Sequence, residues 1–222
     1  MKIFLTGFQR SGTTLLRHVV RNHPDVRKMF HENCLIGHGI EYIKSVCNFD
    51  IDKENWGEKL PWYDIKPRKI YNGTILDYCL DWNELFPDSK IIQIIRHPID
   101  VMNSNLNKFN LGNKQVFEIM DRCIPQIIPK IDLLNNCLSI KFEDLVIAPT
   151  EVLTKMYGFL GLDNNPETVM SVVRHKQYRL EGIIKSRVFA YAKENRPYEL
   201  KIKNFDFGNI IDVLNKIEGT RY

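Results

Sequence analysis

Long apolar segments and blocks of charge are missing from this sequence of 222 residues. No stretch reaches 18 consecutive apolar residues, so we expect no membrane-spanning segment. No run of five or six basic residues occurs, and the formal net charge is only +4, which argues against a nucleic-acid partner. Hydrophobic residues still make up 44% of the chain, an ordinary value for a globular protein. We therefore expect one domain over residues 1–222.

Cysteine is scarce and scattered. The chain has five cysteines, an odd number, and none forms a C-x-x-C pair. Met1 is followed within a few residues by an apolar run with strand character, so we expect no signal peptide. We interpret the cysteines as reduced packing residues of a cytoplasmic protein. They are Cys34, Cys47, Cys79, Cys123 and Cys137.

Short apolar runs alternate with helical patterns along most of the chain. Runs that are apolar on both faces are typical of a parallel sheet covered on both sides. The alternation predicts a doubly wound α/β fold with three layers. We expect Pro125 to break the third helix. The predicted strands lie at 3–5, 26–30, 91–95 and 138–140, and the predicted helices at 12–21, 98–107, 114–134 and 149–160.

Two segments do not follow this alternation. Residues 48–70 are polar, aromatic and proline-containing, and we expect them to form an excursion over the top of the sheet. Residues 176–207 look like a long, charged loop region. Each segment is either a lid or binding loop, or a surface insertion, and the sequence leaves both alternatives open.

The segment GFQRSGTT, residues 7–14, has the outline of a phosphate-binding loop between a strand and a helix. The lysine of the common triphosphate loop is missing, and Thr13 stands in its place. Arg10 supplies a positive charge three residues earlier, with a planar fork of N–H donors. The alternative is a plain strand–turn–helix, which the R-S-G-T-T combination disfavours. The predicted anion-binding residues are Arg10, Ser11, Gly12, Thr13 and Thr14.

A second basic group follows the apolar run at 91–95. Arg96 leaves the end of this predicted strand, and Pro98 suits the first turn of a helix. Helical spacing places residues 97, 101 and 104 on one face, so the Ser104 hydroxyl can point toward Arg96. The two side chains predict a second phosphate site. The alternative is a surface arginine and a serine that bonds locally within its helix.

Three blocks of this sequence resemble the sulfotransferases that use 3′-phosphoadenosine 5′-phosphosulfate (PAPS), above all the tyrosylprotein and bacterial branches. GFQRSGTTLLRHVVRNHPDV resembles the 5′-phosphosulfate loop of that family and the helix after it. FPDSKIIQIIRHPIDVMNSNLN resembles the 3′-phosphate segment, with Arg96 and Ser104 at the matching positions. IKFEDLVIAPTEVLTKMYGFLGL resembles the segment that follows the fourth strand in the family.

The resemblance implies a fold like that of P-loop nucleoside-triphosphate hydrolases. It also implies PAPS as co-substrate, 3′-phosphoadenosine 5′-phosphate (PAP) as product, and no metal. Arg10 is then expected to act in catalysis as well as in binding. A basic loop containing Ser186, between Lys185 and Arg187, is expected to reach over the nucleotide. Phe142 replaces a tyrosine that many relatives have, and we expect Glu143 and Asp144 to be structural.

The resemblance leaves the base and the assisting lysine open. Family bases are a histidine or a glutamate near the end of the second strand, where this chain has His31 and Glu32. We favour Glu32, with capping of the next helix as the alternative for both residues. Lys59, in a stretch resembling the family's G-x-K-x-P, is the candidate to assist the leaving group. Lys66 could take that role instead, or Lys59 could be an exposed surface residue.

The leading hypothesis is therefore a PAPS-dependent sulfotransferase. The alternatives are a P-loop small-molecule kinase and a nucleotide-binding module without activity. The acceptor is expected to be a small-molecule, carbohydrate or peptide hydroxyl. The sequence leaves its identity and the oligomeric state open.

Overall fold

A computed structural model of the chain describes residues 1–62, 71–109, 113–174 and 206–217. Within these residues, five parallel strands form one sheet in the order β2-β3-β1-β4-β5. The strands are β1 (Lys2–Phe8), β2 (Val26–His31), β3 (Asn55–Trp62), β4 (Lys90–Ile95) and β5 (Cys137–Lys141). The helices are α1 (Thr13–Arg21), α2 (Leu35–His38), α3 (Ile40–Val46), α4 (Ile75–Leu85), α5 (Pro98–Phe109), α6 (Asn113–Asp132), α7 (Phe142–Ile147), α8 (Pro149–Leu160), α9 (Pro166–Val173) and α11 (Gly208–Asn215).

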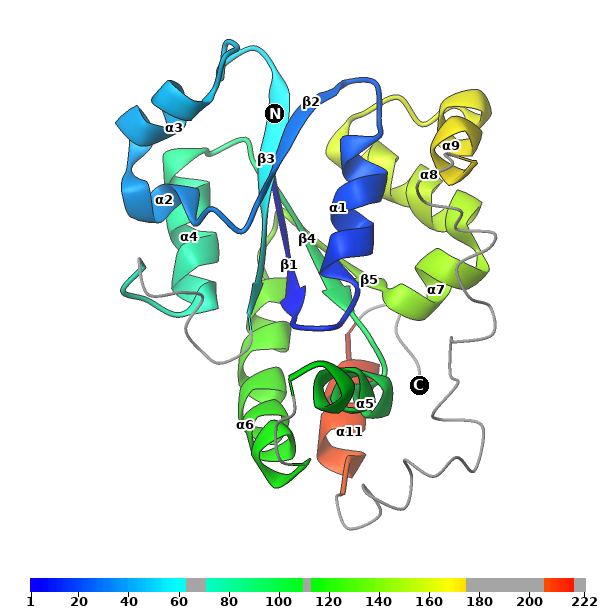
Figure 1. Cartoon of the computed structure of the whole chain (residues 1–222). Helices are drawn as coiled ribbons and strands as arrows, with labels where there is room; N and C mark the ends of the chain where they lie inside the picture. Colours follow the sequence, from blue (N-terminus) through cyan, green and yellow to red (C-terminus); the bar gives the residue numbers. More distant parts are fainter. Residues whose placement is uncertain (63–70, 110–112, 175–205, 218–222) are drawn as a thin grey trace.

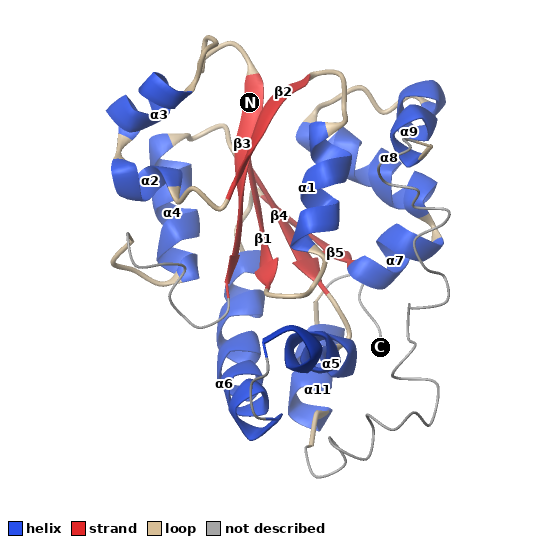
Figure 2. Ribbon diagram, viewed as in Figure 1, coloured by secondary structure: helices blue, strands red, loops and turns tan. Residues whose placement is uncertain are grey.

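Helices cover both faces of the sheet, as the apolar runs predict (Figures 1 and 2). Side chains alternate along β1, so Ile3 and Leu5 pack in one core cluster with α1, α8 and α9. Phe4 and Phe8 pack in the other cluster, with α4, α6 and α11. All four side chains are buried, which is why the strand reads as a nearly continuous apolar run. The three-layer α/β prediction is confirmed.

The prediction for residues 48–70 is wrong for residues 55–62. Residues 55–62 form β3, which pairs with β2 on one side and with β1 on the other. The buried side chains of Trp56 and Leu60 hold this strand in the core. The sequence pattern does not indicate this strand because it contains Glu58 and Lys59, and charged side chains are rare in the middle of a sheet unless they have partners. Residues 63–70 lie outside the described residues.

The predicted break at Pro125 is also wrong. Helix α6 runs without interruption through Pro125 and Pro129. A proline inside a helix costs about 3 kcal/mol or more, whereas each fully buried large apolar side chain contributes about 1.5–3 kcal/mol. The apolar face of α6 therefore outweighs its prolines. Its buried members include Met120, Ile124, Ile127, Ile128 and Ile131.

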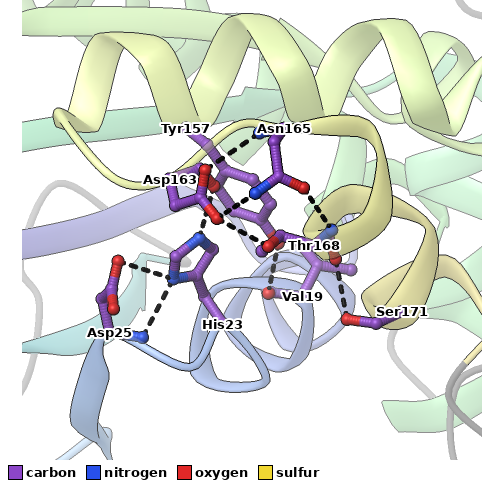
Figure 3. Close-up of polar contacts among 8 residues, drawn as sticks. All are labelled: Val19, His23, Asp25, Tyr157, Asp163, Asn165, Thr168 and Ser171. Atoms are coloured by element: carbon purple, nitrogen blue, oxygen red, sulfur yellow. Dashed lines mark hydrogen bonds and ion pairs between the residues drawn. The ribbon is translucent and has the colours of Figure 1, made fainter.

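A buried histidine, His23, follows α1 and connects this helix to the end of α8 (Figure 3). The Asp25 backbone N–H donates to His23 Nδ1 over 3.1 Å, so Nε2 carries the proton and donates to the Asp163 carbonyl over 2.7 Å. The rings of His23 and Tyr157 form a T-shaped contact, and the Tyr157 hydroxyl donates to the Val19 carbonyl. These contacts fix the C-terminal end of α1 against the end of α8.

Two further expectations concern membrane spans and the cysteines. In the part of the chain that the structure describes, no helix combines the length and hydropathy needed to cross a bilayer. All five cysteines lie in that part and none forms a disulfide. Three of them are buried, in agreement with a packing role, and these are Cys34, Cys79 and Cys123.

Candidate nucleotide and sulfuryl-transfer site

The loop between β1 and α1 exposes the beginning of the helix to a pocket. Gly12 is the N-cap residue, with φ 99°, and has no side chain to satisfy the first amides of α1. A Cβ at this position would lie 2.3 Å from a ring carbon of Phe142, so only glycine fits. Arg10 is also left-handed, with φ 72°. Unsatisfied amides at a helix N-terminus are suited to an anion.

The loops that follow β1 and β4 lie side by side. The two strands are parallel neighbours, so Arg96 emerges beside the first loop. Its Nη1 donates to the Arg10 carbonyl over 3.3 Å, and its guanidinium lies over the Phe142 ring at 4.4 Å. From α5, Ser104 Oγ accepts from Arg10 Nε over 2.8 Å. The alternative for Ser104, a bond within its own helix, is wrong because its partner comes from the other loop.

The electrostatics of this corner favour an anion. Burial, and after it the nearby charge of Arg96, lowers the pKa of Arg10. The Asp100 carboxylate lies near Arg96, with Oδ2 3.9 Å from Nη2. Two guanidinium groups placed together gain from a ligand with several negative charges.

A lysine inside β3 and a glutamate just after β2 face each other. Lys59 Nζ lies 2.5 Å from Glu32 Oε1, and the Glu32 N–H donates to the Lys59 carbonyl over 2.9 Å. The Lys59 side chain is 1% exposed, so the surface-lysine alternative is wrong. Residue Glu32 directly follows β2 and has φ 57°. The buried Lys59 and its partner Glu32 therefore form an ion pair at the edge of the pocket, where an acceptor molecule could contact them.

His31 lies on the other side of Glu32. Its Nε2 is 3.7 Å from Glu32 Oε1, and its side chain is 48% exposed. Burial and the charge of Lys59 are the leading causes that lower the pKa of His31. The next helix, α2, has Cys34 as its N-cap residue, with no side-chain bond to the helix amides. Neither His31 nor Glu32 is therefore its N-cap residue.

The arginine corner and the Lys59–Glu32 pair border one pocket of about 220 Å³. Its lining contains most of the predicted site residues, together with Gln9 and Pro61, which sequence reasoning missed. Gln9 could have been found from its place in the loop, and Pro61 from the stretch around Lys59. The lining residues are Gln9, Arg10, Gly12, Thr13, Thr14, Glu32, Lys59, Pro61, Arg96 and Ser104.

Several predicted residues have another place. Ser11 is buried, does not line the pocket, and donates its N–H to the Phe8 carbonyl. Ser186 and Lys66 lie outside the described residues. Buried Glu143 accepts from the His97 N–H over 2.9 Å, in agreement with the structural role expected for it. The described residues hold no cluster of three or more potential metal-ligating His, Cys, Asp or Glu side chains.

Three comparisons relate the chain to known proteins. The family described as "Sulfotransferase domain" matches residues 1–195. The protein-tyrosine sulfotransferase of Drosophila melanogaster is 23% identical over 210 residues, and the alignment covers 79% of this chain but only 40% of that relative.

Two solved structures share the fold. The sulfotransferase domain from the curacin biosynthetic pathway has a TM-score of 0.65 at 16% identity, covering 99% of this chain and 98% of that one. Mouse sulfotransferase SULT7A1, solved complexed with PAP, has a TM-score of 0.55 at 19% identity, covering 88% of this chain and 66% of that one.

Proposed function

The chain belongs to the sulfotransferase domain family, and we propose that it transfers a sulfuryl group from PAPS to a hydroxyl acceptor and releases PAP. The observation that carries the proposal is the shared pocket, which has two arginines at one end and the Lys59–Glu32 pair at the other. In this proposal the arginine end is the anion site and Glu32 is the base, so both functions share one cavity. The mouse relative complexed with PAP supports the choice of nucleotide.

The arginine end of the pocket suits the phosphates of the nucleotide. We assign the 5′ phosphosulfate to Arg10, Thr13, Thr14 and the first amides of α1, where fixed donors and the helix dipole meet an anion. We assign the 3′-phosphate to Arg96 and Ser104. A 3′-phosphate contact would distinguish PAPS from ATP.

The Lys59–Glu32 end suits the chemical step. In the step we propose, an acceptor hydroxyl oxygen forms a bond to sulfur while the bond from sulfur to the 5′-phosphate oxygen breaks. The electron pair of the broken bond stays on the phosphate, and the acceptor proton passes to the Glu32 carboxylate. Lys59 and Arg10 place positive charge where the leaving phosphate gains negative charge.

No observation favours the kinase alternative. Thr13 stands at the position of the lysine that binds phosphates in triphosphate loops. Thermal unfolding with ligand separates the two activities. PAP at about 100 times its dissociation constant should add about 2.7 kcal/mol to the free energy of unfolding, and ATP with Mg²⁺ should add much less. Stabilisation by ATP with Mg²⁺ alone would favour the kinase.

The acceptor class is a small-molecule, carbohydrate or peptide hydroxyl. The name of the Drosophila relative makes a tyrosyl peptide the first acceptor to test. The test is incubation of the protein with labelled PAPS and an acceptor panel, read as a mass shift. Transfer to one class supports the proposal. Absence of both transfer and PAP binding contradicts it.

We also propose a cytoplasmic location. Its support is the set of five cysteines without a disulfide, which suits a reducing compartment.

A further inference from the structure

Glu58 is a buried carboxylate beside Lys59 that the proposed mechanism does not use. Its exposure is 0%, and it points to the opposite face of β3 from Lys59. Its Oε2 accepts from the Tyr78 hydroxyl over 2.7 Å and from the Leu35 N–H over 3.0 Å. The Tyr78 oxygen also accepts from the Ile36 N–H over 3.2 Å. A buried carboxylate is costly unless it is bonded in this way.

These bonds hold the beginning of α2, which cannot hold itself. The helix has four residues, too few to be stable without outside contacts. Its N-cap residue, Cys34, gives no side-chain bond to the helix amides. Glu58 and Tyr78 supply this cap from a neighbouring strand and helix, since they accept from the first two helical amides.

The segment before α2 is conformationally strained and carries the proposed base. Glu32 has φ 57° and Cys34 has φ 53°, in the left-handed region. Such a conformation costs about 1–3 kcal/mol for each residue that is not glycine and persists only when surrounding contacts impose it. In this segment the contacts that impose the left-handed conformation come from two residues of β3, one contacting each end of the segment. Lys59 holds the backbone of Glu32, and Glu58 holds the amide of Leu35, three residues later.

We propose that Glu58 is a positioning residue, which with Tyr78 holds residues 32–36 so that the Glu32 carboxylate faces the pocket against Lys59. The inference rests on the proposed function in that Glu32 is taken as the base. Glu58 contacts no reacting atom in this account. Two successive residues of one strand then have different roles. Lys59 acts inside the pocket, and Glu58 fixes the segment that places Glu32 in the pocket.

The test compares four variants of the full chain. Glu58→Leu removes both bonds, while Glu58→Gln keeps an oxygen that can accept them. Tyr78→Phe removes the bridging hydroxyl. Tyr157→Phe is the matched control, because it deletes an equally buried hydroxyl bond, to the Val19 carbonyl, in the other core cluster. Each variant is measured for kcat, KM for PAPS, PAP affinity, the pH profile of kcat and thermal unfolding.

A misplaced reacting group can cost about 100-fold in rate. We expect Glu58→Leu to lower kcat by about that factor and Tyr78→Phe by about tenfold, with PAP affinity and KM for PAPS within about twofold. Glu58→Gln should recover most of kcat. The acid limb of the pH profile should move to higher pH in Glu58→Leu and Tyr78→Phe. A carboxylate separated from its cation stays protonated up to a higher pH. Tyr157→Phe should change neither kcat nor the limb.

A parallel Glu32→Gln variant separates the two proposals. If Glu32→Gln retains activity, the assignment of the base is wrong. If it abolishes transfer while Glu58→Leu and Tyr78→Phe keep the wild-type kcat and acid limb, the positioning role alone is overturned. Should Glu58→Leu fail to fold, Tyr78→Phe against Tyr157→Phe decides, since equal kcat and equal acid limbs in that pair also overturn it.

Discussion

The two ends of the pocket are built in different ways. The arginine end comes from two loops that directly follow β1 and β4, and it uses helix amides, Arg10 and Arg96. The other end comes from the interior of β3 and a left-handed turn after β2, where Lys59 meets Glu32. The first end is assembled from contiguous motifs, whereas the second depends on tertiary contacts. We therefore expect substitutions at the first end to affect nucleotide binding and those at the second to affect turnover.

The largest expected effect is at the base. Glu32→Gln should lower kcat by about 100- to 10,000-fold, the usual range for loss of a general base, and leave PAP affinity nearly unchanged. Single-turnover transfer from labelled PAPS and PAP titration measure the two quantities. His31→Gln is the neighbouring control and should stay within about threefold. A reversed result, with His31→Gln inactive and Glu32→Gln active, would make His31 the base.

The next effect belongs to the arginine end. Arg96→Gln should weaken PAP binding by about 10- to 100-fold, because charged hydrogen bonds contribute about 1.5–3 kcal/mol. At saturating PAPS, kcat should change much less. Titration calorimetry with PAP measures the affinity, and Arg21→Gln, at an exposed position on α1, is the control. Equal losses in kcat and affinity would mean that the two ends do not work separately.

The two ends of the pocket also differ in how well the sequence alone predicts them. Gly12, Arg10 and Arg96 are predicted because a strand–loop–helix pattern surrounds each of them. Lys59 is found only by resemblance, and its strand is missed because Glu58 and Lys59 interrupt the apolar run. The partners that allow those charges, Glu32 and Tyr78, are distant in sequence, and a sequence pattern does not report such contacts. The predicted helix break at Pro125 is wrong for a related reason, since the tertiary burial of α6 outweighs the local effect of the proline.

A smaller effect is expected at the glycine of the first loop. Gly12→Ala should lower the free energy of unfolding by about 1–3 kcal/mol, through backbone strain and contact with Phe142. It should also weaken PAP binding. Gly161→Ala is the control for strain alone, because φ is 64° there and, among the described residues, no atom other than those of its immediate chain neighbours and its own helix comes within 4 Å of the added Cβ. Chemical denaturation of both variants measures the difference, and equal losses would exclude a contribution from Phe142.

The smallest effect concerns pH. Burial, then the charges of Arg96 and Lys141, lowers the pKa of His97 to about 4 from 6.5. Between these values the unfolded chain binds a proton that the folded chain does not, so stability falls as pH falls. The share of His97 between pH 7 and pH 5 is about 1–2 kcal/mol. Denaturation at both pH values should show a smaller drop for His97→Asn, and an unchanged drop would exclude His97 as a source.

The most direct test of the central claim is a titration of the wild-type protein with PAP and with adenosine 5′-monophosphate, which lacks the 3′-phosphate. A PAPS-dependent enzyme that holds the 3′-phosphate with Arg96 and Ser104 should bind PAP about 10- to 100-fold more tightly than the monophosphate. Arg96→Gln should remove most of that preference. Equal affinity of the wild-type protein for both nucleotides would contradict the assignment of the pocket to PAPS.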